Sequence, residues 1–343
     1  MKSTKITITD VAKYAGVSRA TAGRVIGNYG NVSEKARKKV EQAAAELNYS
    51  PNAIAQGLRS QKTNTIAIVA DRISNRFFSN LIESIEKEVF ERGYNVIICN
   101  THEDIDIEIR QMKMLHNRRV DAIIIAPAFM PGSSQKRGDF SLYQSDIPLV
   151  VIDRPMEKVP FKQDLIVSDN FGGAYKAAEY LLGLGHTHIA AMTTKLFPTE
   201  LQRLAGFRAA LKDHGVPFEP ECLLVPDKGD VTKGDMLIKE LLLLHEKYEA
   251  LLIMNINFLP SVLKGLREQG KKVPEDLSII VWDETDLTEC LGITTVAQFP
   301  EFMGKMAAQR AIALVEKTED KEPREKTLPT ELHIRNSCVK PKA

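Results

Sequence analysis

Residues 7–26 read TITDVAKYAGVSRATAGRVI, and this stretch contains two short helical patterns separated by a glycine. Thr7 and Asp10 have the spacing of a capping box, in which each side chain satisfies a free backbone N–H at the start of a helix. The first pattern stops at Gly16, and Ser18 is placed to cap a second helix. Two short helices joined by a glycine turn predict a helix-turn-helix.

A third helix is predicted on the carboxyl side of this unit, after a turn rich in Gly and Asn. Ser33 can cap it, and Ala36, Val40, Ala44 and Leu47 follow at helical spacing. These apolar side chains form one face that can cover the first two helices. The amino-terminal part of the chain therefore predicts an all-α, three-helix head.

A fourth, shorter helix is predicted at about residues 51–59. Pro51 fits the first turn of a helix, and a polar connector begins after Leu58. A helix of this length does not hold together alone in water. We therefore expect this segment, the predicted hinge helix, not to be stably helical by itself.

From Thr65 onwards the pattern changes to short apolar runs separated by amphipathic stretches. The strand-like runs are Ile66–Ala70, Val96–Cys99, Ala122–Ala126, Leu149–Ile152, Ile189–Met192, Ala250–Met254 and Ser278–Val281. Helical spacers between apolar strands are typical of parallel α/β sheets. We therefore divide the chain into a head at residues 1–63 and a body at residues 64–343 that is long enough for two α/β lobes.

The charge of the chain is unevenly distributed between these parts. Residues 1–63 contain 11 Lys and Arg against 4 Asp and Glu, which leaves 35 of the 46 basic and 41 of the 45 acidic residues to the body. A small basic module joined to a mildly acidic body indicates a head that binds a polyanion such as nucleic acid.

Cysteine spacing and hydropathy exclude other classes of protein. The four cysteines form neither a CxxC pair nor a disulfide framework, and they are Cys99, Cys222, Cys290 and Cys338. No apolar run approaches the ~20 residues that cross a bilayer, and the first residues lack the apolar core of a signal peptide. We therefore expect a cytoplasmic protein with no membrane partner.

The sequence also lacks the common catalytic and cofactor motifs. It contains no Walker-type phosphate loop, no GxSxG nucleophile turn and no HExxH zinc motif. His186 and His188 are two residues apart, so they would lie on opposite faces of a strand and do not predict a metal site. We predict neither an enzyme nor a cofactor.

Polar and aromatic side chains follow several predicted strands, at the edge where open α/β sheets bind ligands. This predicted ligand-binding set consists of Asn75, Phe77, Phe78, Asp153, Arg154, Arg203, Asn255, Trp282, Asp283 and Gln298.

The head resembles the lactose/galactose repressor family of bacterial transcription regulators along its whole length. The resemblance is carried by Ile8–Ala12, Ala15–Ser18, Thr21, Arg24–Ile26, Val32–Ser33, Arg37, Val40, Ala45–Tyr49 and Pro51–Asn52. The body, from Thr65 to about Arg335, resembles the two-lobed periplasmic sugar-binding-protein fold that this family shares. The resemblance implies an N-lobe at about residues 64–167 plus 299–330 and a C-lobe at about residues 168–298 plus 331–343.

In that family the second helix of the head lies in the DNA major groove, and a hinge helix inserts a leucine into the minor groove. The residues implied to contact DNA are Thr7, Ser18, Arg19, Ala20, Thr21, Arg24, Asn31, Ser33, Asn52, Ala55 and Leu58. The implied partners are a palindromic operator and a second copy of the chain, in a homodimer or a dimer of dimers. Gly23 departs from the usual Ser and should weaken its helix by up to ~1 kcal/mol relative to Ala.

The ligand-binding set resembles the sugar pocket of that fold, which implies a repressor of sugar-utilisation genes with a small sugar effector. Asp153 and Asp283 suit hydroxyl donors and oppose a phosphate, so we expect an unphosphorylated monosaccharide bound between Phe78 and Trp282. A purine or a sugar phosphate is the alternative effector. A transport-type sugar-binding protein is the alternative class, and the basic head argues against it.

We predict that operator affinity falls steeply with salt, because the seven excess positive charges of residues 1–63 act on phosphates. In titrations of the full-length protein at several salt concentrations, log affinity should fall with log salt by ~0.9 for each phosphate neutralised. An affinity that does not change with salt would contradict the electrostatic role of the head.

Overall fold

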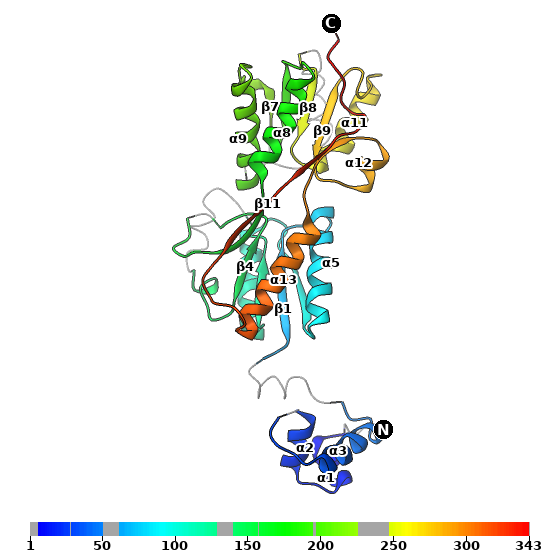
Figure 1. The fold of residues 1–343 in the computed structure, drawn as a ribbon, viewed down its shortest axis with the longest axis vertical. Helices are drawn as coiled ribbons and strands as arrows, with labels where there is room; N and C mark the ends of the chain where they lie inside the picture. The colour runs from blue at the N-terminus through cyan, green and yellow to red at the C-terminus, as the bar shows by residue number, and fades with distance from the viewer. Residues whose placement is uncertain are drawn as a thin grey trace. The chain divides into compact units, whose positions relative to one another are not determined.

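The computed structural model describes residues 6–27, 29–50, 62–128, 140–156, 158–194, 197–225 and 247–342. The chain forms two compact units, Met1–Thr65 with Arg119–Asp121, and Ile66–Arg118 with Ala122–Ala343. The first unit contains the helical head, and the second is the α/β body (Figure 1). No helix in these described ranges is long and apolar enough to span a membrane.

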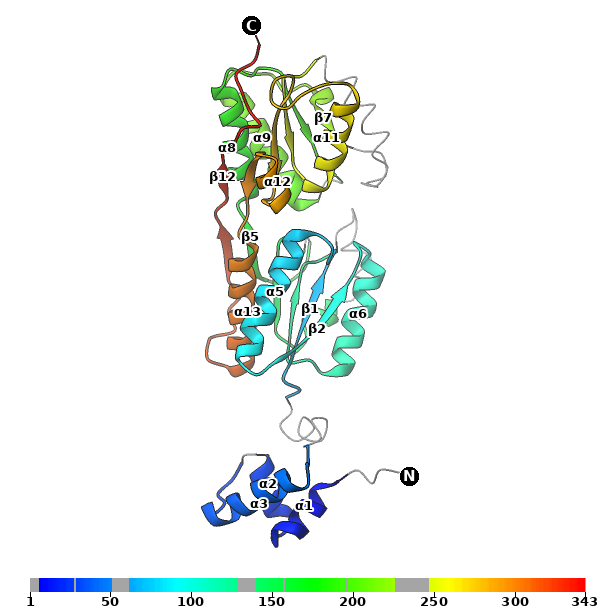
Figure 2. The same ribbon diagram turned by 90° about the vertical axis from the view of Figure 1, so that its right-hand side faces the viewer.

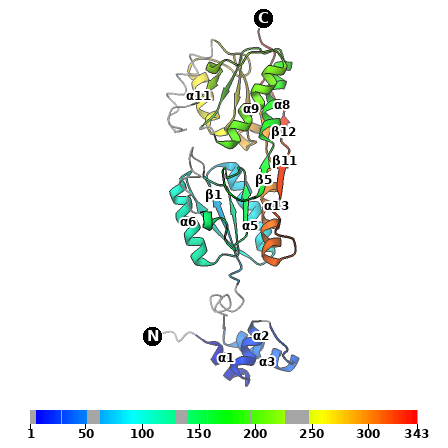
Figure 3. The same ribbon diagram turned by 90° about the vertical axis from the view of Figure 1, so that its left-hand side faces the viewer.

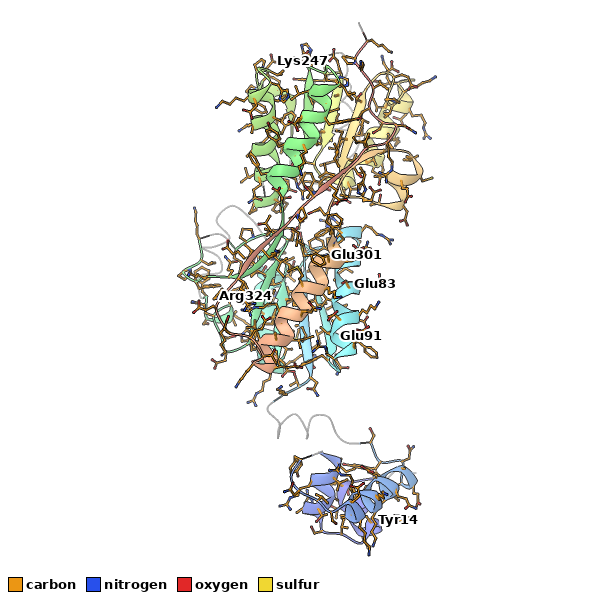
Figure 4. All side chains as sticks on the ribbon, viewed as in Figure 1. Tyr14, Glu83, Glu91, Lys247, Glu301 and Arg324 are labelled. Carbon is orange, nitrogen blue, oxygen red and sulfur yellow. The ribbon has the colours of Figure 1, made fainter. Side chains whose placement is uncertain are left out.

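Three short helices form the described part of the head, and they are α1 (Ile8–Ala15), α2 (Arg19–Ile26) and α3 (Glu34–Glu46). Their core is built from short side chains, and its buried members are Val11, Ala12, Ala15, Ala22, Val25, Val40 and Ala43. Tyr14 ties α1 to α3, because its hydroxyl donates to Glu46 Oε2 at 2.6 Å (Tyr14 is labelled in Figure 4). The predicted hinge helix at about residues 51–59 lies outside the described residues.

The helix starts of the head are capped as the sequence predicts. The Asp10 carboxylate accepts a hydrogen bond from the Thr7 N–H at 2.8 Å. Ser18 Oγ accepts from the Thr21 N–H at 3.0 Å, and the predicted serine cap of α3 is also present. Gly16 has a φ of 64°, the left-handed conformation that glycine adopts without steric cost. These contacts confirm the predicted helix-turn-helix.

The residues described in the body form two six-stranded sheets. The first has the strand order β11-β5-β4-β3-β1-β2, with β1 (Thr65–Ala70), β2 (Asn95–Asn100), β3 (Ala122–Ile125), β4 (Leu149–Ile152), β5 (Asp164–Ser168) and β11 (Glu325–Leu328). The second has the order β12-β10-β9-β8-β6-β7, with β6 (Ile189–Met192), β7 (Leu223–Leu224), β8 (Ala250–Ile253), β9 (Ser278–Trp282), β10 (Thr294–Ala297) and β12 (Glu331–His333). The expected pair of α/β lobes is confirmed, and we call them the N-lobe and the C-lobe.

The directions of the last two strands show how the lobes face each other. β11 pairs in parallel with β5, whereas β12 pairs antiparallel with β10. Figure 2 shows β11 and β12 as consecutive arrows along one side of the body. The segment from β11 to β12 keeps one direction along the body. It can be parallel to the strands of one sheet and antiparallel to those of the other only if the strands of the two sheets run toward each other. The carboxyl ends of both sheets therefore meet at one junction.

Helices cover both lobes. The N-lobe carries α5 (Arg76–Glu91), α6 (Ile105–Arg118), α13 (Pro300–Glu316) and a 3-10 turn at Phe140–Leu142. The C-lobe carries α8 (Asn170–Gly183), α9 (Pro198–Asp213), α11 (Leu259–Glu268), α12 (Asp286–Cys290) and 3-10 turns at Pro220–Cys222 and Ile256–Phe258.

Each lobe has one pair of tightly packed helices, α5 with α13 and α8 with α9 (Figure 3). A glycine permits each close approach. A Cβ added to Gly304 would lie 2.6 Å from the carbonyl oxygen of Leu81, and one added to Gly206 would lie 2.1 Å from that of Phe171. Glu301 of α13, labelled in Figure 4, also accepts a 2.8 Å hydrogen bond from α5.

We predict that Gly206→Ala destabilises the protein by ~1–3 kcal/mol or more, because its methyl group can be accommodated only by moving the backbone of α8. Gly183→Ala is the matched control, since a Cβ at this last residue of α8 meets nothing within 4 Å. That control should be stabilising by up to ~1 kcal/mol, from the helix preference of Ala. Urea unfolding measures both variants, and equal changes would contradict the close packing of α8 and α9.

Candidate functional site

Charged side chains gather at the junction where the carboxyl ends of the two sheets meet. Asp71 follows β1, Asp153 follows β4 and Asp283 follows β9. Arg154 comes from the same turn as Asp153, and two further members lie in α9. We call these residues the junction cluster: Asp71, Asp153, Arg154, Glu200, Arg203 and Asp283. All are at most 8% exposed except Asp283, which is partly buried.

Asp153 and Asp283 occupy equivalent positions in the two lobes. Asp153 follows the fourth strand from the β2 edge of its sheet, and Asp283 follows the fourth strand from the β7 edge of the other sheet. Their φ angles are 67° and 77°. Each N–H donates at 3.0 Å to a carbonyl of the next strand, that of Ile166 or Val296. A left-handed backbone conformation is uncommon for a residue with a Cβ, although Asp tolerates it better than most residues. Because such strain concentrates at functional sites, these two positions are candidates for a functional role.

Arg154 connects the two lobes. Its Nε donates to Asp153 Oδ2 at 2.8 Å, and its Nη2 donates to Asp71 Oδ2 at 3.0 Å. Its guanidinium carbon lies 4.8 Å from the ring centroid of Phe197, which precedes α9 in the C-lobe. Burial alone would lower the pKa of Arg154, but the Asp153, Asp71 and Glu200 carboxylates outweigh burial and raise it. Arg154 is therefore a cation held between the lobes.

Arg203 is fixed within the C-lobe. Its Nε donates to Asn170 Oδ1 at 2.8 Å and its Nη1 to the carbonyl of Met254 at 2.6 Å. Its guanidinium lies over the ring of Trp282, 4.0 Å from the centroid, and Trp282 is fully buried. In this arrangement the protein's own arginine covers the indole, and the expected stacking of a ligand between Phe78 and Trp282 stays a prediction.

For Asp71 and Asp283, the hydrogen bonds and charges of their partners do not fully offset the effect of burial on the pKa. Burial raises the pKa of Asp71 to about 6, against the opposing effect of Arg154. Burial also raises the pKa of Asp283, while Arg203 and a 2.6 Å hydrogen bond from Gln298 Nε2 act in the other direction. Additional hydrogen-bond donors from a ligand would stabilise both carboxylates.

Five buried polar atoms near the strand ends have no hydrogen-bond partner among the described residues: Asp71 Oδ1, Arg154 Nη1, Ser168 Oγ, Thr193 Oγ1 and Trp282 Nε1. Thr193 follows β6, which is the position equivalent to Asp71 after β1. Each unpaired buried group costs ~1–3 kcal/mol. The set includes donors and acceptors, so this arrangement is suited to a small ligand that carries both. In the part of the chain described, no group of three or more His, Cys, Asp or Glu side chains is placed to hold a metal ion.

The other members of the predicted ligand-binding set have local roles. Asn75 Oδ1 accepts from the Phe77 N–H at 2.9 Å, and Asn255 Oδ1 caps the 3-10 turn that follows it. Phe77 and Phe78 are buried with ring centroids 5.3 Å apart. The structure thus brings together six of the predicted residues: Asp153, Arg154, Arg203, Trp282, Asp283 and Gln298.

Four residues of the site were not predicted: Asp71, Asn170, Phe197 and Glu200. Asp71 directly follows an apolar strand, so the rule that selected Asp153 would also have selected it. Asn170 and Glu200 lie in the first turns of α8 and α9, where the sequence shows only ordinary helix starts.

The second candidate site is the exposed face of α2 and its surroundings. Of the predicted DNA contacts, Thr7, Ser18, Arg19, Ala20, Arg24, Asn31 and Ser33 are exposed, and Thr21 is half-buried. Small side chains between two exposed guanidinium groups allow a helix to approach nucleic acid closely. Asn52, Ala55 and Leu58 lie outside the described residues.

Comparisons with known proteins find relatives of both the head and the body. Residues 7–52 match the family described as bacterial regulatory proteins, lacI family, and residues 178–338 match the periplasmic binding protein-like domain. The HTH-type transcriptional regulator DegA of Bacillus subtilis (strain 168) is 36% identical, over 97% of this chain and 98% of its own length.

Solved structures show the same architecture. A LacI family transcriptional regulator from Enterococcus faecium with bound ribose is 30% identical and has a TM-score of 0.68, over 81% of this chain and 100% of that chain. The Lac repressor dimer bound to operator and the anti-inducer ONPF has a TM-score of 0.84 at 24% identity, over 97% of this chain and 99% of that chain.

These similarities extend over the head and the body together, and the match to DegA covers nearly the full length of both proteins. This chain therefore belongs to the lacI family of bacterial regulatory proteins and is a DNA-binding transcription regulator, not an enzyme.

Proposed function

We propose that this regulator is a repressor of sugar-utilisation genes whose operator affinity is set by an unphosphorylated monosaccharide bound at the junction cluster. The observation that carries this proposal is the set of unpaired buried donors and acceptors beside the cluster. A sugar hydroxyl donates and accepts hydrogen bonds, so one type of group satisfies both kinds of atom. The Enterococcus faecium regulator, whose structure holds ribose, supports this class of ligand.

The charge of the junction cluster favours an uncharged effector. Its four carboxyl groups outnumber its two guanidinium groups, and five of the six residues are buried. A phosphate ester would bring further negative charge into this weakly solvated site, where like charges repel more strongly than in water. Phe77, Phe78 and Asn75 complete the N-lobe side of the proposed site, and Asn255 and Gln298 the C-lobe side.

For operator recognition, the proposal places α2 in the major groove. Arg19, Ala20 and Thr21 would approach base edges, while Arg24 would contact phosphates. Two copies of the chain would bind the two halves of a palindrome as a homodimer, alone or as a dimer of dimers. Large apolar side chains exposed on the body support self-association: Phe90 is 72% and Phe302 54% exposed.

Leu58→Ala is predicted to weaken operator binding, because the proposed role of this side chain is to wedge into a kinked base step. Fluorescence anisotropy with labelled operator DNA measures the affinity. Effector binding by the same variant should match that of the wild type, which also shows that the body is folded. Normal operator affinity would refute the minor-groove role of Leu58.

The effector is tested by calorimetry of the full-length protein with free monosaccharides, sugar phosphates and purines. Asp283→Asn should weaken sugar binding about tenfold or more, since it removes charge-assisted hydrogen bonds. Asn also tolerates the left-handed backbone at this position, where φ is 77°. The exposed Asp146→Asn serves as the matched control. Tight binding of a purine or a sugar phosphate, with no binding of any free sugar, would contradict the proposed effector class.

A further inference from the structure

Asp71 is buried at the junction, but only one of its two carboxylate oxygens has a hydrogen-bond partner among the described residues. It follows β1 directly, is 2% exposed, and accepts one hydrogen bond from Arg154 Nη2 through Oδ2 at 3.0 Å. Its Oδ1 has no partner among the described residues, and neither has Arg154 Nη1. An unpaired acceptor and an unpaired donor thus belong to two side chains that are already bonded to each other.

Asp71 and Glu200 also change the charge of the site. The four members of the junction cluster that the sequence predicts are two aspartates and two arginines, which cancel in charge. The structure adds Asp71 and Glu200 and leaves two more acids than bases. Glu200 is satisfied locally, because Thr199 Oγ1 donates to its Oε2 at 2.7 Å and Thr194 Oγ1 donates to its Oε1 at 3.4 Å. Asp71 is therefore the added acid that keeps an oxygen for a ligand.

We propose that Asp71 is a specificity-determining residue that, with Arg154, binds a hydroxyl or a vicinal pair of hydroxyls of the effector. This inference rests on the proposed function and names the part of the sugar that the N-lobe recognises. A hydroxyl can donate to Asp71 Oδ1 and accept from Arg154 Nη1. A phosphate only accepts and an ammonium only donates, so each would leave one of the two atoms unpaired.

The opposite lobe carries a matching feature. Thr193 stands after β6 as Asp71 stands after β1, and its hydroxyl is also buried without a partner among the residues described. Arg154 meanwhile contacts Phe197 of the C-lobe. None of these atoms is accessible to solvent in this arrangement, so a sugar reaches them when the lobes part and is enclosed when they close.

The test uses calorimetry of the full-length protein with D-ribose, D-glucose and D-galactose. The sugar that binds is then compared with its monodeoxy analogues, each lacking one hydroxyl. Asp71→Asn should weaken binding of the parent sugar at least tenfold. One analogue should bind the wild type weakly and lose no more than about twofold further with Asp71→Asn, because the hydroxyl that Asp71 recognises is already gone.

Glu200→Gln is the matched control variant, since it removes the same charge from the same cluster and leaves in place the hydrogen bond between Asp71 and Arg154 and the two unpaired atoms of that pair. It should preserve the ranking of the deoxy analogues. Operator binding by both variants serves as the check that each is folded.

The pH dependence gives a second readout. The groups that bear on the Asp71 carboxyl are Arg154, Glu103 and Asp153, and burial raises its pKa to about 6. Only the ionised carboxylate accepts through both oxygens, so sugar affinity should rise as the pH increases through 6. At pH 5 about a tenth of Asp71 is ionised, and the affinity should be about tenfold lower than at pH 8. Asp71→Asn should lose this tenfold dependence, and Glu200→Gln should retain it.

The outcomes separate this inference from the proposed function. If the wild type binds a free sugar and Asp71→Asn binds it equally well, Asp71 is not a specificity residue, although the proposed function stands. If the affinity of every deoxy analogue falls by the same factor with Asp71→Asn, Asp71 affects only the fold of the site, and the inference is again overturned. If no free sugar binds the wild type, the proposed function fails and this inference fails with it.

Discussion

Two arginine side chains, Arg154 and Arg203, are buried where the lobes meet, and the surrounding structure is organised to keep them charged. A buried guanidinium without partners would cost several kcal/mol. Arg154 obtains its carboxylates from the N-lobe and rests on an aromatic ring of the C-lobe. Arg203 uses an amide, a strand-end carbonyl and the face of Trp282. The ends of both sheets are therefore fixed in position by these two cations.

The same requirement accounts for the contact that Trp282 makes with Arg203 in this structure. Trp282 was predicted to lie against a ligand because it ends a strand at the binding edge. The indole is an aromatic surface of the right size for a guanidinium, and Arg203 is held above it by two other hydrogen bonds. A sequence shows that an aromatic residue lies at a strand end, but the partner of its ring depends on a helix that is distant in sequence.

Most of the architecture could be predicted because it is encoded locally. The caps of α1 and α2 depend on residues three positions apart, and the strands β1, β3, β4, β6, β8 and β9 are continuous apolar runs. Strands β5, β7, β10, β11 and β12 were not predicted, because pairing with neighbours far along the chain stabilises them more than their own composition does. β11, for example, has three exposed residues out of four. For the same reason Glu200 was missed, since its place in the site follows from the packing of α9 and not from a strand end.

The two lobes follow one structural plan, with the same strand order, a glycine-packed helix pair and a left-handed aspartate at the same strand end. Such a correspondence is what an internal duplication leaves behind. Positions at the junction can therefore be matched between the halves, as Asp71 with Thr193 and Asp153 with Asp283. The two copies can then diverge separately, so that a change of an ancestral side chain in one half alters the ligands admitted while the other half preserves the frame.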